Sequence, residues 1–434
     1  MTSSPRRRRE RHPGQSGRRP YPPRSTQRLL PTGSPWRDQD FRTLFGAAAL
    51  NQLGTNTGHV ATPLLALTAL DASPAQVGTL AALSTLAFPS SACRPGPGST
   101  TCAPAASSSP PTSPGDLARA ALFASLPLAW WLDALTLGPL YAVVLLGGCA
   151  TVFSDLGSQS VLPQLIGREG LVRANTALVT LMSAADIAGR GTGGALVAVL
   201  TAPFAPACSS AAYLASALRL TGIRATPAPA ATARTPLATQ IREGLQHVLG
   251  HPELRALALT ATLNNLGSAV LNTMLPVLFV REPGLSPTSL GPFWAAGGVG
   301  LLLGARLARP LAGRLGDGRA LLLSLIPAAL LVPLLGRSPW LWLAGGAWLL
   351  TMMKIGSDNV LGVSLRRHLT PDALMGRMNA TFRFTLTGAL ALGSATSGLP
   401  AELTTLHTTL WTGAALLAAS WTPVTLSPSR AAAR

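Results

Sequence analysis

The side chains that could bind protons or pair charges in an apolar environment form a small set in this chain. Asp155 and Lys354, the only lysine, occupy matching positions in two related segments. Asp358 follows Lys354 by four residues, and Asp186 precedes Arg190 by the same interval. Residues four apart face each other on a helix, and an ionisable group inside a membrane is costly unless it is paired or hydrated. These five residues are therefore candidates for ion pairing and for coupling to protons.

A second group of polar side chains lies in a stretch that the chain repeats. Residues 50–55 read Leu-Asn-Gln-Leu-Gly-Thr, and residues 263–268 read Leu-Asn-Asn-Leu-Gly-Ser. In an apolar helix such groups must face a partner helix or water, so inter-helix hydrogen bonding and a polar cavity wall both remain open. For the histidine of this group, a packing role and a proton-carrying role remain open. The cavity candidates are Asn51, Gln52, Thr55, Asn56 and His59 in the first copy, and Asn264, Asn265, Ser268 and Asn272 in the second.

The repeats indicate two homologous halves. From residue 50 to residue 78, 9 of the 29 positions are identical to those 213 residues later, without a gap. A second match, of residues 157–162 with 356–361, places Asp155 opposite Lys354. A repeat of this length exceeds the roughly 20–50 residues of solenoid units. For the Asp155–Lys354 register, a static contact and a switch that responds to protonation both remain open.

The elements that must position these residues are apolar helices. Of the 434 residues, 47% are hydrophobic and only 12% are charged. A helix of about 20 apolar residues crosses a bilayer, and it satisfies its own backbone hydrogen bonds there. We therefore predict an all-α membrane protein whose twelve transmembrane helices form two pseudo-symmetric six-helix bundles. The predicted spans are 41–70, 74–93, 116–137, 139–163, 174–199, 203–222, 254–281, 287–308, 319–336, 340–363, 374–399 and 404–425.

The charge distribution predicts the orientation of these spans. A net charge of +18 could by itself indicate a nucleic-acid-binding module. However, with the N-terminus inside, 30 of the 34 lysines and arginines lie on the cytoplasmic side or on helix ends that face it. This asymmetry is the positive-inside rule. We therefore expect a multi-pass protein of the plasma membrane with both termini in the cytoplasm, and no nucleic-acid partner.

Composition also divides the chain. Residues 89–115 form a low-complexity loop unlike the others, and we hypothesise two compensating frame changes there, because shifted codons for 97–102 can encode Trp-Val-Asp-His-Leu. The four cysteines lack metal-site spacing, and no nucleophile elbow or phosphate loop is present, so we predict no enzyme activity, cofactor or metal. The expected units are a disordered tail (1–40), a first half (41–224), a cytoplasmic linker (225–253) with a helix at 237–249, a second half (254–426) and a short tail (427–434).

Three stretches resemble the drug and siderophore exporters of the major facilitator superfamily, the group that includes macrolide-efflux and enterobactin-export proteins. They are residues 162–175 with Leu-Pro-Gln-Leu and Leu-Val-Arg-Ala-Asn, residues 370–380 with Thr-Pro-Asp-Ala-Leu-Met-Gly-Arg-Met-Asn-Ala, and residues 411–428. The resemblance covers residues 37–427 and implies that spans 1, 4, 7 and 10 line a central cavity. It also implies alternating access, with proton-driven efflux of a small amphipathic compound by a monomer in the lipid bilayer. An importer of the same fold is an alternative.

The loop motif of that superfamily is incomplete in this chain. Between the second and third spans its place is taken by the 89–115 segment, so no residue can be assigned there. The copy in the second half keeps Arg314, Gly316 and Arg319, while Gly313 stands where an aspartate is expected. By the resemblance, this motif latches the two halves on the cytoplasmic side. An inactive or non-transporting relative is therefore a further alternative.

Overall fold

A computed structural model describes most of the helical part of the chain. The residues described are 36, 38–91, 113–221, 237–282, 285–315, 340–420 and 422–425. Within them every regular element is a helix. The helices are α1 (Gln39–Ala69), α2 (Pro74–Ser91), α3 (Ser113–Trp131), α4 (Leu137–Leu200), α5 (Ala205–Leu220), α6 (Leu237–Gly250), α7 (Pro252–Arg281), α8 (Pro287–Leu315), α11 (Leu341–Leu369), α12 (Asp372–Leu403), α13 (Leu406–Ala419) and α14 (Thr422–Thr425).

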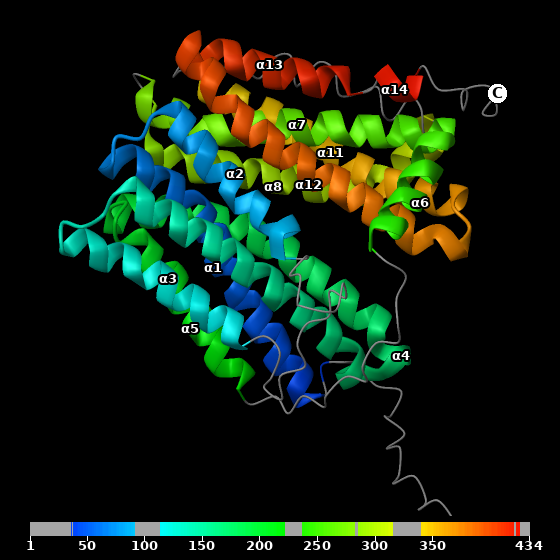
Figure 1. Cartoon of the computed structure of the whole chain (residues 1–434), viewed down its shortest axis with the longest axis horizontal. Helices are drawn as coiled ribbons and strands as arrows, with labels where there is room; N and C mark the ends of the chain where they lie inside the picture. Colours follow the sequence, from blue (N-terminus) through cyan, green and yellow to red (C-terminus); the bar gives the residue numbers. More distant parts are fainter. Residues whose placement is uncertain are drawn as a thin grey trace, which may run out of the picture.

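The long helices form two groups that meet at one end and diverge at the other. Helices α1, α3, α4 and α5 run obliquely below, and α7, α8, α11, α12 and α13 run together above them (Figure 1). Helix α2, which follows α1, belongs with the first group. The most extensive packing between the groups is that of α2 on α12 and of α4 on α8, and α1 and α2 also contact α7. The molecule therefore has a closed end, which carries the α1–α2 turn, and an open end, which carries α6 and the bend of α4.

Helix α4 reverses its direction although its backbone is helical throughout. Thr151 and Arg190 both line the same cavity. In a straight helix these residues would be about 58 Å apart, at roughly 1.5 Å per residue. Near the reversal, Leu162 and Ala174 belong to one apolar cluster with Phe41 of α1. The spans predicted at 139–163 and 174–199 are thus the two arms of α4, and the expected break between them is wrong because the turn itself is helical.

Glycines allow the two groups to approach closely at the closed end. A methyl group on Gly194 of α4 would lie 2.8 Å from the Cα atom of Gly291 in α8, and one on Gly398 of α12 would lie 2.5 Å from the carbonyl oxygen of Pro74 in α2. Small residues permit such backbone contacts between membrane helices. The largest apolar core cluster also lies at this end, and it draws residues from both groups.

Polar contacts add to this closure. The Arg281 guanidinium, at the end of α7, donates to the carbonyl oxygen of Ala72 over 2.9 Å. The backbone N–H of Ala75 donates to the Glu402 carboxylate of α12 over 3.1 Å. Both bonds join the first group of helices to the second. The closed end is therefore held by hydrogen bonds as well as by packing.

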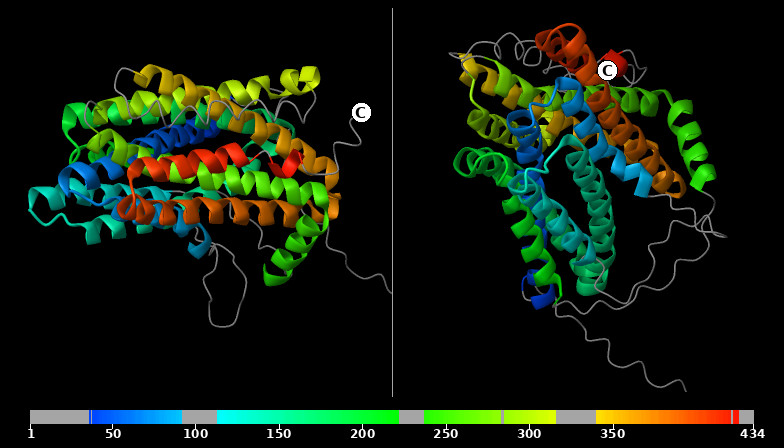
Figure 2. Two further views of the ribbon diagram at one scale, coloured as in Figure 1. Left: turned by 90° about the horizontal axis from the view of Figure 1, so that it is seen from above. Right: turned by 60° about the vertical axis from the view of Figure 1, so that its left-hand side comes forward.

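Helix α6 lies close to the range predicted for a helix in the linker, and it docks on the second group. Glu243 pairs with Arg377 of α12, while Val248 joins an apolar cluster with Met378 and Phe382. Figure 2 shows α6 beside the end of α12 that lies away from the α12–α13 turn. The segment is strongly amphipathic, so one face can bury apolar residues while the other stays polar.

Several predicted boundaries differ from the observed ones. Helix α3 begins at Ser113 and ends at Trp131, whereas the span was expected at 116–137. Residues 319–336, with the ninth predicted span, lie outside the described residues. Taken alone, two described helices, Pro252–Arg281 and Pro287–Pro310, have both the length and the hydropathy of a membrane span. Frequent glycine, threonine and serine lower the mean hydropathy of the other helices.

Candidate functional site

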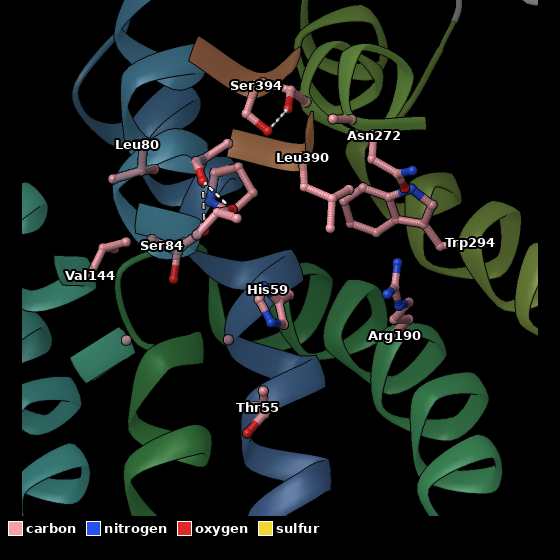
Figure 3. A pocket seen from close by; sticks show the side chains of 18 of the residues that line it. Thr55, His59, Leu80, Ser84, Val144, Arg190, Asn272, Trp294, Leu390 and Ser394 are labelled. Atoms are coloured by element: carbon pink, nitrogen blue, oxygen red, sulfur yellow. Dashed lines mark hydrogen bonds between the residues drawn. The ribbon is translucent and has the colours of Figure 1, made fainter. Parts of the chain in front are cut away.

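A cavity of about 520 Å³ lies where the two groups of helices meet. Its wall includes Thr55 and His59 of α1, Arg190 of α4, Asn272 of α7 and Trp294 of α8 (Figure 3). Both arms of α4 and helix α11 also contribute side chains. The wall therefore includes the four predicted cavity spans, 1, 4, 7 and 10, and both halves of the repeat contribute to it.

An ion pair lies in this wall. The Arg190 Nε atom donates to the Asp186 Oδ1 atom over 2.8 Å, one helical turn away, and both side chains are nearly one-third exposed. The Arg190 guanidinium also lies 5.8 Å from the ring centroid of Trp294, within the range of a cation–π contact. The neighbouring Gly189 and Gly193 pack against α1, at Asn56 and Val60. Arg190 is thus held by its local partner while it remains accessible from the cavity.

Two tryptophans give the cavity wall hydrogen-bond donors that have no protein partner. Trp294 and Trp348 both line the cavity, and both are almost fully buried. The Nε1 atom of each is buried without a hydrogen-bond partner among the described residues. Buried polar groups are normally paired, and an unpaired one costs about 1–3 kcal/mol. A guest molecule with acceptor atoms would remove that cost.

Beside the cavity, a buried ion pair joins α3 to its neighbours. Asp116 and Arg119 are 1% and 2% exposed, and the Arg119 Nη1 atom lies 3.7 Å from the Asp116 Oδ1 atom. The Asp116 carboxylate accepts hydrogen bonds from Asn51 over 2.5 Å, Ser154 over 2.9 Å and Ser216 over 2.7 Å. Both of its oxygens are therefore satisfied, by donors from α1, α4 and α5.

The guanidinium of this pair is equally well held. Arg119 donates to Asn51 Oδ1 over 3.0 Å and to Thr55 Oγ1 over 2.6 Å. Its Cζ atom lies 3.8 Å from the ring centroid of Tyr213 in α5. Neither member of the pair was predicted as a site residue from the sequence, and Arg119 was counted among the residues on helix ends that face the cytoplasm. The signal was present as a carboxylate and a cation three residues apart at the start of an apolar run.

The second half contains a corresponding ion pair on α11. The Lys354 Nζ atom lies 2.9 Å from the Asp358 Oδ2 atom. Lys354 also donates to Asn264 over 3.3 Å and to Ser420, just after α13, over 2.9 Å. Asp358 lines a second cavity of about 290 Å³. Ser268 lines both cavities, so the second one borders the first.

Each of the two duplicated asparagines hydrogen-bonds to both members of the ion pair in its own half. The Asn51 amide nitrogen donates to Asp116, and its oxygen accepts from Arg119. The Asn264 amide nitrogen donates to Asp358 over 3.0 Å, and its oxygen accepts from Lys354. The repeat in the sequence therefore corresponds to a repeated structural role, although the ion pairs belong to α3 in one half and to α11 in the other.

The predicted cavity residues separate into three sets. Thr55, His59, Ser268 and Asn272 line the central cavity, while Asn264 and Asn265 line the second one. Asn51, Gln52 and Asn56 are absent from both walls, and Asn56 bonds to the Gln52 carbonyl oxygen over 3.0 Å within α1. For Asn51 and Asn56, the structure favours hydrogen bonding within the half.

Some candidates lie outside the described part of the structure. Asp155 and Arg314 belong to described helices, but their side chains are not described. Gly316 and Arg319 lie entirely outside the described residues. The proposed Asp155–Lys354 contact therefore stays a prediction. The partners described for Lys354 all belong to the second half.

Comparisons with known proteins agree with this arrangement. The family model of the transmembrane secretion effectors, MFS_3, matches residues 117–431. Enterobactin exporter EntS of Escherichia coli O1:K1 / APEC is 28% identical over 283 residues, which cover 64% of this chain and 67% of EntS. EntS of Escherichia coli O139:H28 (strain E24377A / ETEC) is 27% identical with the same coverage.

Solved structures show a similar fold. The nucleoside transporter NupG superposes with a TM-score of 0.68 at 12% identity, over 89% of this chain and 99% of NupG. A bacterial homologue of the iron transporter ferroportin, in an inward-facing state, gives a TM-score of 0.63 at 17% identity, over 88% of this chain and 98% of the homologue. At such identities the likeness concerns the fold alone, and it supports the expected all-helical fold.

Proposed function

Because the chain belongs to the transmembrane secretion effectors of the major facilitator superfamily, in the group of siderophore and drug exporters, we propose that it exports a small amphipathic compound by proton-driven alternating access. The observation that carries this proposal is the central cavity, whose wall is shared between two homologous halves. Secondary transporters hold their substrate between such repeats and expose it by rocking one against the other.

The shape of the molecule fits one stage of that cycle. The halves touch at the end that carries the α1–α2 turn and diverge at the end that carries α6 (Figure 1). In the orientation predicted by the positive-inside rule, the diverging end faces the cytoplasm. The cavity would then be open to the compartment from which an exporter takes its substrate. One chain supplies the whole wall, so a monomer in the bilayer of the cell membrane suffices.

The cavity wall also indicates the kind of compound. Phe123, Tyr213, Trp294 and Trp348 offer aromatic surface, and the two indole N–H groups have no acceptor in the part of the chain that the structure describes. The wall further contains Arg190, whose charge is only partly screened by its pair with Asp186. An apolar body with several hydrogen-bond acceptors would match both features. The relatives named above export enterobactin, so enterobactin and the macrolide erythromycin are suitable first probes.

Transport into inside-out membrane vesicles tests the proposal. Vesicles from an efflux-deficient host with this chain should accumulate labelled enterobactin or erythromycin when their lumen is acidified, and a protonophore should abolish the accumulation. Replacing the cavity residue Asn272→Leu should reduce uptake. Thr396→Leu is the matched control, because Thr396 is exposed on α12 and bonds only within its own helix.

The alternatives give different results. An importer would accumulate the probe in right-side-out vesicles instead. An inactive relative would fold and reach the membrane, yet it would move neither probe in either type of vesicle. The second result would refute the transport proposal for these two compounds, and nucleic-acid binding by the purified protein would contradict the expected absence of such a partner.

A further inference from the structure

The two asparagine-bridged ion pairs differ in one respect that bears on proton binding. In the first half, each carboxylate oxygen of Asp116 has a hydrogen-bond donor, and the side chain is 1% exposed. Asp116 also lines neither of the two cavities. A carboxylate that is saturated with donors and closed off from a cavity has no free position for a proton. Its geometry is that of a structural group.

In the second half, the carboxylate is satisfied on one oxygen only. The Asp358 Oδ2 atom receives both Lys354 and Asn264, whereas the Oδ1 atom is buried and has no hydrogen-bond partner among the described residues. The side chain is 10% exposed and lines the second cavity. Leaving an ionised oxygen buried and unpaired is unfavourable. A proton on that oxygen would remove the charge and supply a donor.

We propose that Asp358 is the group that binds and releases the transported proton, and that Asn264 and Lys354 position it. This inference rests on the proposed function as an exporter. A proton from water in the second cavity would form an O–H bond at Oδ1, and the carboxylate would lose its negative charge. The ion pair with Lys354 then weakens, while Lys354 keeps its bonds to the Asn264 and Ser420 oxygens. Loss of the proton restores the pair.

The location of the pair gives this step a mechanical consequence. Asn264 belongs to α7, Lys354 and Asp358 to α11, and Ser420 follows α13. A change of charge at Asp358 therefore alters a contact that connects three helices of the second half. Because Ser268 of α7 lines both cavities, the same helix contacts the substrate cavity. Proton binding and cavity shape are thus linked through α7.

The surroundings contain few competing groups. Among the residues that line the second cavity, the other charged or titratable ones are Arg366 and His368, both on α11. Helices α7 and α12 contribute only uncharged residues to this wall, and the partner near α13 is a serine. On α8, which packs against α11, Arg306 and Arg309 are exposed. Asp358 is therefore the one carboxylate in the described wall of this cavity.

Infrared difference spectroscopy tests the site without any substrate. Spectra of the purified protein, recorded between acidic and neutral pH, contain a C=O band from every carboxyl that takes up a proton, and the chain has 16 aspartates and glutamates. The difference spectrum of Asp358→Asn is therefore subtracted from that of the wild type, and the remainder should show the protonated-carboxyl C=O band of Asp358. The matched comparison is Asp116→Asn, whose spectrum should keep the band because Asp116 has no free oxygen. Asn264→Ala should shift the pH midpoint of the band, as expected of a positioning residue. Absence of this band from the wild-type-minus-Asp358→Asn spectrum would overturn the assignment, and so would its loss in Asp116→Asn protein that circular dichroism shows to be folded.

Transport in proteoliposomes tests the coupling. A gradient of about one pH unit can support up to about tenfold accumulation per coupled proton. With labelled erythromycin and enterobactin as probes, Asp358→Asn should lose this accumulation yet retain exchange of labelled for unlabelled probe, and Asp358→Glu should recover part of it. If Asp358→Asn still accumulates a probe against its gradient, Asp358 is not the coupling group. If the wild type exchanges neither probe, the proposed function fails for them, whereas the infrared result on Asp358 stands independently.

Discussion

The glycine contact between α12 and α2 predicts how the closed end can be opened by one methyl group. A Cβ atom on Gly398 would lie 2.5 Å from the Pro74 carbonyl oxygen and 2.8 Å from the Ala75 nitrogen. Both neighbours are backbone atoms, so they cannot rotate away as a side chain would. The substitution Gly398→Ala must therefore push α12 and α2 apart at this end.

The size of the effect follows from the packing. Overpacking of this kind costs about 1–3 kcal/mol. If the cost falls on the closed state alone, the ratio of closed to open molecules drops by about 5–150-fold. The control is Gly388→Ala in the same helix, where a methyl group would have nothing within 4 Å. Alanine also favours a helix by up to about 1 kcal/mol relative to glycine, so the control should not weaken α12.

Spin labels on the two halves can measure this opening. Leu132, in the loop after α3, and Leu403, at the end of α12, are both well exposed at the closed end. Cysteines at these positions, in a background without the four native cysteines, would carry the labels. Gly398→Ala should shift the measured distances to longer values, and Gly388→Ala should leave them unchanged. Equal distances in Gly398→Ala and the wild type, or equal shifts in both variants, would refute the argument.

Three further predictions concern the charged and polar groups. Asp116→Asn leaves the Arg119 charge buried, so thermal unfolding should show a loss of about 3–5 kcal/mol; an unchanged melting temperature would contradict this. Hydrogen bonds from the Ser73 side chain and the Ala75 N–H lower the pKa of Glu402. Above the ordinary carboxyl pKa of about 4.3, this contact therefore stabilises the closed end in full, and the stabilisation is lost as the pH falls through the lowered pKa. The label distances should lengthen in that acidic range, and Glu402→Gln should remove this part of the pH dependence. Trp348→Phe removes an unpaired donor from the cavity, so the affinity for an acceptor-rich probe, measured by equilibrium binding, should fall by about 1 kcal/mol, whereas an apolar probe should bind as before.

The local parts of the site were predictable from the sequence. The pairs Asp186–Arg190 and Lys354–Asp358 are each four residues apart, so helical geometry alone brings them together. The apolar runs likewise predicted most helices within a few residues. The reversal between the two arms of α4 was predicted, because 139–163 and 174–199 were expected as successive spans. That the turn between them stays helical was not predicted.

The non-local parts depended on the rotation of each helix about its axis. The polar stripe of α1 was expected to face a cavity, yet Asn51 faces the buried ion pair of α3. Hydropathy does not reveal this, since a polar residue lowers it equally whether it contacts water or a partner helix. The low-complexity segment before α3 also obscured the start of that helix, and Arg119 was counted among the residues on helix ends that face the cytoplasm. Only the packing of α1, α3 and α5 shows where that side chain lies.

The docking of α6 on α12 determines which segment connects the two halves of the chain. Because Glu243 and Val248 attach α6 to α12, this helix should move with the second half if the halves rock as proposed. The chain between Leu220 and Leu237 then connects the two halves covalently. At roughly 3.3–3.6 Å per residue, a stretch of this length can span at most about 50–60 Å. Cleavage of the chain in this stretch would therefore yield two fragments, one for each half, and the second would begin with α6.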